Sequence, residues 1–186
     1  AGLLTARPAQ TFVAEYGRLS GVTTSAQVVG LTQHFDSPVV IAKTTSANGS
    51  DPVAVRVSQV QGNSFQLQLQ EPKGADGVSP EEDVSWMVVE EGTWALEGGQ
   101  ILQAGRYDTA TLANAGNFDA ISFAPKAFGA TPAVVSQVQT LNGASWVSTR
   151  QRDATADGVS LAMTEADNSD GLHAVETLGW VAMSEV

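Results

Sequence analysis

Short runs of alternating apolar and polar residues recur along this chain, and none of them is long. Residues 53–58 (VAVRVS) and 65–70 (FQLQLQ) alternate with a period of two, which is typical of half-buried β-strands. Further apolar runs, two of them opening on proline and two containing tryptophan, predict strands at 38–42, 132–135, 84–89 and 178–183. The pattern therefore favours many short strands.

Turn residues separate these runs. Gly62-Asn63 lies between the two alternating runs, and Asp157-Gly158 occupies the corresponding place later in the chain, so each predicts a β-hairpin. No segment carries a sustained apolar stripe with the helical period of 3.6 residues, and only residues 110–115 have the propensity for a short helix. We predict an all-β fold, an antiparallel β-sandwich.

The chain also repeats itself. When the sequence is shifted by 94 residues, thirteen positions from Pro38 onward are identical without a gap. They include four pairs that bear on structure: Asn48-Gly49 with Asn142-Gly143, Arg56 with Arg150, Glu82 with Glu176, and Trp86 with Trp180. We predict two tandem antiparallel β-sandwich copies of about 93 residues each, at 1–92 and 93–186. The two tryptophans share a strand face with apolar residues and are expected in the core.

Composition excludes several classes of function. The 186 residues carry a formal net charge of −11, which disfavours binding to nucleic acids and to anionic membrane surfaces. No apolar run approaches the roughly 20 residues that span a bilayer. Cysteine is absent, so disulfides and thiolate sites are excluded, and zinc is disfavoured with only two histidines. The chain begins at Ala1-Gly2 without a signal peptide, which suggests a mature chain or an excised domain.

Trp146 is the first candidate for ligand binding. Strand alternation places it on one face with Arg150 and Arg152, and a polar, cationic face is expected to lie in solvent. An exposed indole there would stack on a sugar ring while the arginines donate to hydroxyls or carboxylates. The alternative is that Trp146 packs against the other copy or covers a loop.

Arg56 and Arg150 recur together with acidic residues at Glu71 and Glu165 and at Glu82 and Glu176. A polar ligand site repeated in each copy would explain this recurrence, with Arg56 as a further sugar-binding residue. Ion pairs that hold the sandwich together are the favoured explanation, because charges near a core must be paired.

The acidic loops offer carboxylates that could bind calcium, which takes six to eight oxygen ligands. The weak candidates are Glu165, Asp167 and Asp170, although the EF-hand spacing is absent. We expect either no cofactor or Ca²⁺.

Neither histidine belongs to the repeated framework, because His34 aligns with Phe128 and His173 with Ser79. No nucleophile elbow, phosphate loop or dinucleotide motif is present, so we do not expect an enzyme.

The order of features in each copy resembles the H-type lectin domain of invertebrate agglutinins and the discoidin C-terminal region. The first copy carries Phe35, Pro38, Arg56, Phe65 and Trp86, and the second carries Phe128, Pro132, Arg150, Val159 and Trp180. This resemblance implies a six-stranded antiparallel sandwich that binds sugars without catalysis. At the sugar-contacting positions of the family the chain has Pro52 and Trp146, and Pro72 and Ala166, so the identity of the sugar does not carry over.

The sequence therefore predicts a non-catalytic carbohydrate-binding module that binds a polysaccharide or oligosaccharide. Its location would be secreted or extracellular, as part of a bacterial polysaccharide-degrading enzyme or an adhesin. The expected partners include no nucleic acid and no membrane, and assembly into a homo-oligomer stays open. The alternative is a structural or adhesive spacer in a larger extracellular bacterial protein, with no affinity for glycans.

Overall fold

The structure is a computed structural model that describes residues 12–77, 79–166 and 171–185. Over these residues the chain forms thirteen β-strands and one short 3₁₀ turn, and it contains no α-helix. No helix in this part of the chain is long and apolar enough to cross a membrane. The predicted all-β fold is confirmed.

Six strands make up the first half of the structure, and they pair antiparallel in two sheets. They are β1 (Ala14–Val22), β2 (Gln27–Gly30), β3 (Pro38–Thr44), β4 (Ala54–Gln61), β5 (Ser64–Gln70) and β6 (Glu82–Glu90). One sheet has the order β1-β6-β3 and the other the order β2-β5-β4. The core between them is built around Phe35, Phe65 and Leu67, which are almost fully buried.

The second half contains the remaining elements. They are β7 (Gly92–Ala95), β8 (Ile101–Thr109), the 3₁₀ turn η1 (Ala113–Ala115), β9 (Asp119–Ser122), β10 (Ala133–Val138), β11 (Val147–Arg152), β12 (Gly158–Glu165) and β13 (Glu176–Met183). Their sheets have the orders β10-β13-β8-β7 and β11-β12-β9. Apart from the added edge strand β7, this is the strand order of the first half.

The pairing register agrees with the shift of 94 residues seen in the sequence. Arg56 lies opposite Gln68 in the first half, and Arg150 lies opposite Ala162 in the second. Gly17 pairs with Trp86 and Gly105 with Trp180, although these two glycines are 88 residues apart because the second half is longer between β8 and β10 than the first half is between β1 and β3. A Cβ atom would lie 2.5 Å from Trp86 Cζ2 at the first glycine and 2.6 Å from Trp180 Cζ2 at the second, so each indole needs its glycine. The boundary after residue 92 stays a prediction.

The strand predictions agree with the structure. The six apolar runs overlap β3, β4, β5, β6, β10 and β13. Trp180 is buried as expected, and Trp86 packs against the first core while keeping part of its side chain accessible. The segment 110–115, which has the propensity for a short helix, forms only the turn η1. The strands β1, β2, β7, β8 and β9 escaped prediction because their apolar residues do not alternate regularly.

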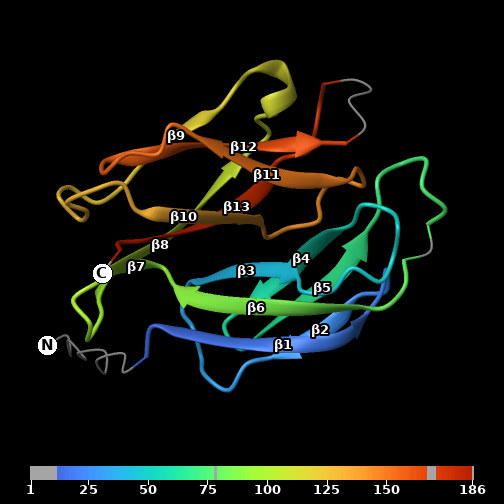
Figure 1. Ribbon diagram of the computed structural model, residues 1–186, viewed down its shortest axis with the longest axis horizontal. Coiled ribbons are helices and arrows are strands. Elements are labelled where there is room, and N and C mark those ends of the chain that lie inside the picture. The colour runs from blue at the N-terminus through green and yellow to red at the C-terminus, as the bar shows by residue number, and fades with distance from the viewer. Residues whose placement is uncertain (1–11, 78, 167–170, 186) are drawn as a thin grey trace, which may run out of the picture.

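The two halves pack against each other through sheets that each have a core on their other face. Figure 1 shows the β10-β13-β8-β7 sheet between the β11-β12-β9 sheet and the first half. The apolar residues at this junction are Val39, Ile41 and Val89 of the first half and Leu102, Ala104 and Val181 of the second. The contact therefore forms a separate hydrophobic core between the halves.

Two glutamines of the second half bind the backbone of the first. The Gln139 side chain accepts from the Val40 N–H at 2.6 Å and donates to the Pro38 carbonyl at 3.5 Å. The Gln137 amide donates to the Val55 carbonyl at 2.9 Å. Because β3 is the edge strand of its sheet, Gln139 satisfies backbone groups that would otherwise be left open to further strand pairing.

Candidate functional site at the junction of the two halves

A buried glutamate holds the Asn-Gly loop in each half. In the first half, Glu82 accepts from the Ser46 hydroxyl and from the backbone N–H groups of Asn48 and Gly49. In the second half, Glu176 accepts from the Thr140 hydroxyl and from the N–H groups of Asn142 and Gly143. The shared Asn-Gly and Glu positions of the repeat are thus explained by a shared carboxylate clamp.

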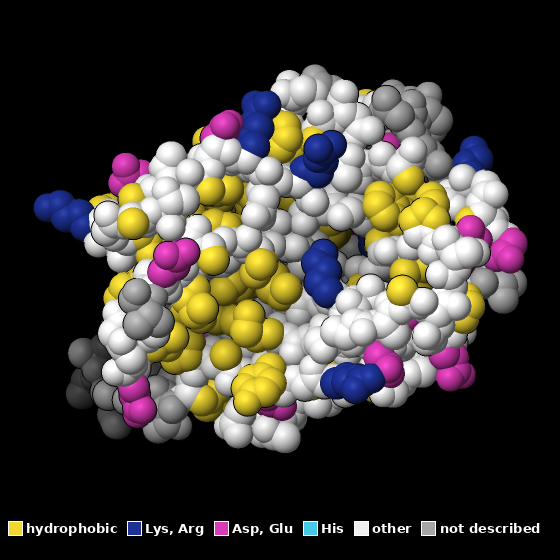
Figure 2. All heavy atoms as spheres, viewed as in Figure 1, with side chains coloured by type: hydrophobic (Ala, Val, Ile, Leu, Met, Phe, Trp, Pro, Cys, Tyr) yellow, Lys and Arg dark blue, Asp and Glu magenta, His cyan; other side chains and the backbone are white. Residues whose placement is uncertain are grey.

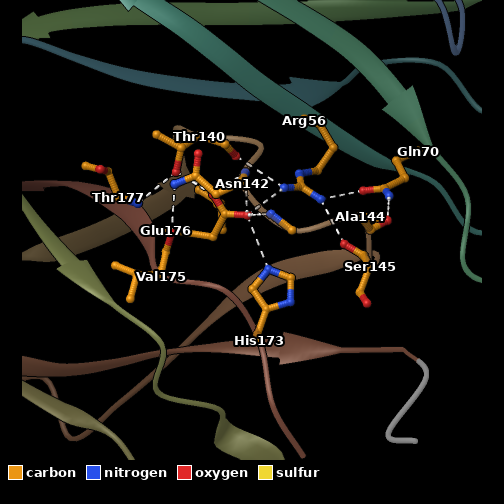
Figure 3. Close-up of polar contacts among 12 residues, drawn as sticks. Arg56, Gln70, Thr140, Asn142, Ala144, Ser145, His173, Val175, Glu176 and Thr177 are labelled. Carbon is orange, nitrogen blue, oxygen red and sulfur yellow. Dashed lines mark hydrogen bonds and ion pairs between the residues drawn. The ribbon is translucent and has the colours of Figure 1, made fainter. Parts of the chain in front are cut away.

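Arg56 connects the first half to the clamp of the second. Its guanidinium donates to the carbonyls of Ser145 at 3.0 Å and Thr140 at 3.2 Å, and it pairs with the Glu176 carboxylate at 3.4 Å (Figure 3). The side chains of Arg56 and Glu176 are both 0% exposed. The favoured prediction of an ion pair is therefore met for Arg56, but the partner lies in the other half of the chain.

The His173 imidazole contacts the same carboxylate. Its Nδ1 faces Glu165 Oε1 at 2.6 Å and its Nε2 faces Glu176 Oε1 at 3.2 Å, and all three side chains are buried. In the first half this position is Ser79, whose hydroxyl donates to Glu71 at 2.8 Å. The second half thus carries an imidazole where the first carries a hydroxyl.

Hydrogen bonding decides the ionisation of these carboxylates. Burial by itself would raise the pKa of Glu176, but donation from Thr140, the backbone and His173 outweighs it and lowers the pKa. The Ser46 hydroxyl and the loop N–H groups lower the pKa of Glu82. Burial lowers the pKa of Arg56, and the Glu176 carboxylate opposes that shift. The clamps therefore require charged carboxylates.

A pocket, here called the junction pocket, lies beside this network where strands of both halves meet. Its volume is about 90 Å³. It is lined by Lys43, Thr44, Val53, Ala54 and Val55 of the first half and by Gln137, Trp146, Val147, Ser148 and Thr149 of the second. The ends of β3 and β10 and the beginnings of β4 and β11 position these side chains.

Two polar atoms of the pocket-lining residues are buried without a protein partner. They are Nε1 of Trp146, a donor, and Oε1 of Gln137, an acceptor. Partial desolvation of the Lys43 ammonium, which lines the same pocket, lowers its pKa. A buried donor or acceptor left unsatisfied costs about 1–3 kcal/mol, so these groups favour a ligand that both donates and accepts hydrogen bonds.

The structure separates the four predicted sugar-binding residues. Trp146 is half-buried and lines the junction pocket, so its indole does not stand free in solvent as expected from strand alternation. Arg150 and Arg152 are exposed on β11, and the Arg152 guanidinium lies 4.1 Å from the centroid of the Phe118 ring. Arg56 has no exposed surface, so a glycan has no access to its guanidinium and its role is structural.

The structure describes one of the three calcium candidates. Glu165 is engaged by His173, while Asp167 and Asp170 lie outside the described residues. The first half instead brings together carboxylates of Asp51, Glu71 and Asp76, with oxygens within 4.8 Å of one another. They border a pocket of about 340 Å³ with the loop residues Asn48 and Gly49.

Sequence reasoning missed Gln137 and Lys43. They occupy equivalent positions near the ends of β10 and β3, shifted by 94 residues, and both project from otherwise apolar strands. The available signal was a polar residue inside an apolar strand. What that side chain faces, however, depends on how the halves pack.

Comparisons with known proteins identify one similar sequence. No protein family and no solved structure matches the chain. The chain is 32% identical over 174 residues to Halomucin of Haloquadratum walsbyi (strain DSM 16790 / HBSQ001), a match that covers 88% of this chain. It spans 2% of the length of Halomucin. The resemblance to H-type lectins stays a prediction.

Proposed function

We propose that the chain is a non-catalytic carbohydrate-binding module of a large extracellular protein and that a glycan binds at the junction pocket. The observation that carries this proposal is the pairing of a buried, unpartnered donor on Trp146 with a buried, unpartnered acceptor on Gln137. A sugar hydroxyl donates one hydrogen bond and accepts others, so two neighbouring hydroxyls would satisfy both atoms.

The size of the pocket sets how the glycan would lie. A volume of about 90 Å³ admits the hydroxyl-bearing edge of one sugar and not a whole ring. The rest of the glycan would extend over the exposed surface of β11, where Arg150 and Arg152 lie. Their guanidinium groups would donate to hydroxyls or carboxylates further along the chain of sugars.

An extracellular setting is supported by the similarity to Halomucin, a large extracellular surface protein. A chain that corresponds to 2% of such a protein would act as one module among many. A weak site repeated along a long chain would hold a polysaccharide through multivalency.

Titration calorimetry with a panel of algal and plant polysaccharides, with and without a chelator, tests the proposal. Trp146→Phe keeps an aromatic ring and removes the N–H, so affinity should fall about fivefold, the value of one hydrogen bond. Trp94→Phe is the matched control, because the Trp94 indole donates to the Glu90 carbonyl away from the pocket. Equal affinities of the Trp146→Phe and Trp94→Phe variants would show that the junction pocket is not the binding site. Loss of affinity with the chelator would assign a role to calcium.

A structural spacer is the second candidate, and one observation favours it. The pocket beside the Trp146 indole is completed by residues of the first half, which fits a side chain that helps to join the halves. A spacer predicts no affinity for any member of the panel. An enzyme would release reducing ends from a bound polysaccharide, and the proposed module releases none.

A further inference from the structure

The two sheets of the second half do not match along one side. The larger sheet has the order β10-β13-β8-β7 and the smaller has the order β11-β12-β9. β10 lies against β11, where the Thr149 hydroxyl donates to the Ser136 carbonyl at 3.0 Å. β8 lies against β9, where the Thr109 hydroxyl donates to the Asp119 carboxylate at 2.6 Å. Within the described ranges no strand lies beside β9 to cover β7, whereas the two sheets of the first half have three strands each.

The unmatched side is hollowed into a cleft of about 390 Å³, here called the edge cleft, between β7, β8 and β9. Its walls include Gly105, Tyr107, Ala120, Ile121, Ser122 and Trp180. A Cβ atom on Gly105 would lie 2.6 Å from Trp180 Cζ2, so the absence of a side chain there leaves the edge of the indole as part of the wall. The edge cleft shares no lining residue with the junction pocket, and it lies where a fourth strand of the smaller sheet would run.

One wall of the edge cleft is the free edge of β9. The Phe123 N–H donates to the Asp157 carbonyl at 2.9 Å, in the register of the pair between β9 and β12. Backbone groups of successive strand residues point to opposite sides, so those of Ile121 also point toward β12. The N–H and C=O groups of Ala120 and Ser122 therefore point away from β12, on the side of the cleft that both residues line. A free edge of this kind is a template for one more strand.

The other walls favour a particular kind of side chain. Trp180 and Ile121 are largely apolar, while the Tyr107 hydroxyl is buried and has no partner among the described residues. Burial and the nearby Asp119 carboxylate raise the pKa of Tyr107, so its hydroxyl keeps its proton and remains a donor. The same carboxylate repels a second negative charge. The walls thus favour a large side chain that is apolar along its length and ends in a neutral oxygen.

The Tyr107 hydroxyl does not belong to the repeated framework. Tyr107 pairs with Leu178, and Leu19 pairs with Val84 at the equivalent position of the first half, because Leu178 and Val84 are related by the shift of 94 residues. The half-buried side chain of Leu19 packs on the first core and offers no hydrogen bond. The edge cleft therefore carries a polar group that the sandwich does not need for its packing.

Charge favours a basic partner for this cleft. The chain has a formal net charge of −11, and Figure 2 shows Asp and Glu side chains spread around the margin of the molecule. At the cleft itself, the Arg106 guanidinium pairs with the Glu91 carboxylate at 3.3 Å, so this cation is already neutralised. A positively charged segment is therefore attracted to the chain, and an acidic one is repelled.

We infer that the edge cleft binds an extended, basic peptide segment, which adds to β9 as a fourth strand of the smaller sheet. Its backbone pairs with Ala120 and Ser122, and one large side chain enters the cleft beside Trp180 and Tyr107. A sugar offers no row of alternating N–H and C=O groups, so the free edge favours a peptide over a glycan. The partner and the surface both differ from those of the proposed function, and the inference does not rest on that proposal.

The test uses the full chain labelled with ¹⁵N and a nine-residue peptide. The peptide has a lysine at each end, alternating threonine and valine between them, and a tyrosine at its centre on the valine face. Amide hydrogen exchange followed by NMR reports the contact. The N–H groups of Ala120 and Ser122 should exchange at least tenfold more slowly with saturating peptide, because strand pairing removes them from water. The same peptide with glutamate at both ends should bind more weakly.

Proline variants identify the edge. Ala120→Pro removes an N–H that the folded sheet does not use, so the chain should fold as before while the affinity for the peptide falls at least tenfold. Val28→Pro is the matched control, because Val28 is the counterpart of Ala120 on the edge strand β2 and does not line the cleft. If Ala120→Pro does not fold, Ser122→Pro makes the same change at the other outward-facing residue.

Tyr107→Phe tests the place of the inserted side chain. It should weaken binding of the tyrosine peptide about fivefold and leave binding of a peptide with alanine at its centre unchanged, because only the tyrosine peptide brings an oxygen to the Tyr107 hydroxyl. Equal weakening of both peptides would assign Tyr107 a structural role and overturn this placement.

Three results would overturn the inference as a whole. They are unchanged exchange of Ala120 and Ser122 with every peptide, equal affinity of the native chain and the Ala120→Pro variant, and protection of the two amides by an oligosaccharide but not by a peptide. The last result would assign the edge cleft to a glycan. Trp146→Phe should leave peptide binding unchanged, so the edge cleft and the junction pocket are tested separately.

Discussion

Arg56 and Glu176 form an ion pair at 3.4 Å with no exposed surface on either side chain, and they come from opposite halves of the chain. Arg56→Met removes the cation while Glu176 stays buried, so the free energy of unfolding should fall by about 3 kcal/mol. Chemical denaturation followed by tryptophan fluorescence measures this change.

The repeat supplies the control for this prediction. Arg150→Met changes the equivalent residue of the second half, which is exposed, and should leave the unfolding free energy nearly unchanged. Equal losses in the two variants would mean that the arginine stabilises its own sandwich and not the junction.

The glycines beside the core tryptophans predict a local packing effect. Gly17→Ala would place a Cβ atom 2.5 Å from Trp86 Cζ2, so the indole must shift and stability should fall by about 2 kcal/mol. Gly30→Ala adds the same methyl group where no atom lies within 4 Å, and it should be neutral or slightly stabilising. Thermal unfolding of both variants checks this, and a stable Gly17→Ala variant would contradict the tight indole packing.

The carboxylate clamps predict loss of stability in acid. The pKa values of Glu82 and Glu176 are lowered in the folded state, so the unfolded chain takes up protons at a higher pH than the folded chain does. Their stabilisation is complete above the pKa of an unfolded glutamate, about 4.3, and is lost as the pH falls through the lower folded values.

Denaturation between pH 7 and pH 3 measures this dependence. Ser46→Ala removes the strongest donor to Glu82 and should flatten the fall, whereas Ser50→Ala, an exposed serine of the same loop, should not. Parallel curves for the wild type and Ser46→Ala would show that the clamp does not cause the acid sensitivity.

The strands with regular alternation could be predicted from the sequence, and so could the repeat. Leu67 and Leu69 alternate with glutamines because one face of β5 meets the core and the other does not. The shared positions of Glu82 and Glu176 could also be found, since each side chain acts within its own half. Strand β1 carries Tyr16 and Arg18 on its exposed outer face. Because no described part of the chain covers that face, the alternation of apolar and polar residues along β1 is weak.

The candidate site depends on contacts that no single strand encodes. Arg56 has an acidic residue in the equivalent repeat position of its own half, Glu82, but it binds Glu176, because packing decides which surfaces of the halves meet. The same packing turns Trp146 toward a pocket completed by Val53 and Val55. Gln137 lines the pocket only because the first half packs over it.

The most direct test of the proposed sugar site is the indole N–H region of the ¹⁵N-correlated NMR spectrum during titration with oligosaccharides of the best-binding polysaccharide. The four tryptophans give four indole signals, and Trp146→Phe assigns one of them. Hydrogen bonding of a sugar hydroxyl to Trp146 should shift that signal with saturation while the Trp94 signal stays in place. Saturable binding that leaves the Trp146 indole signal unmoved would contradict the site.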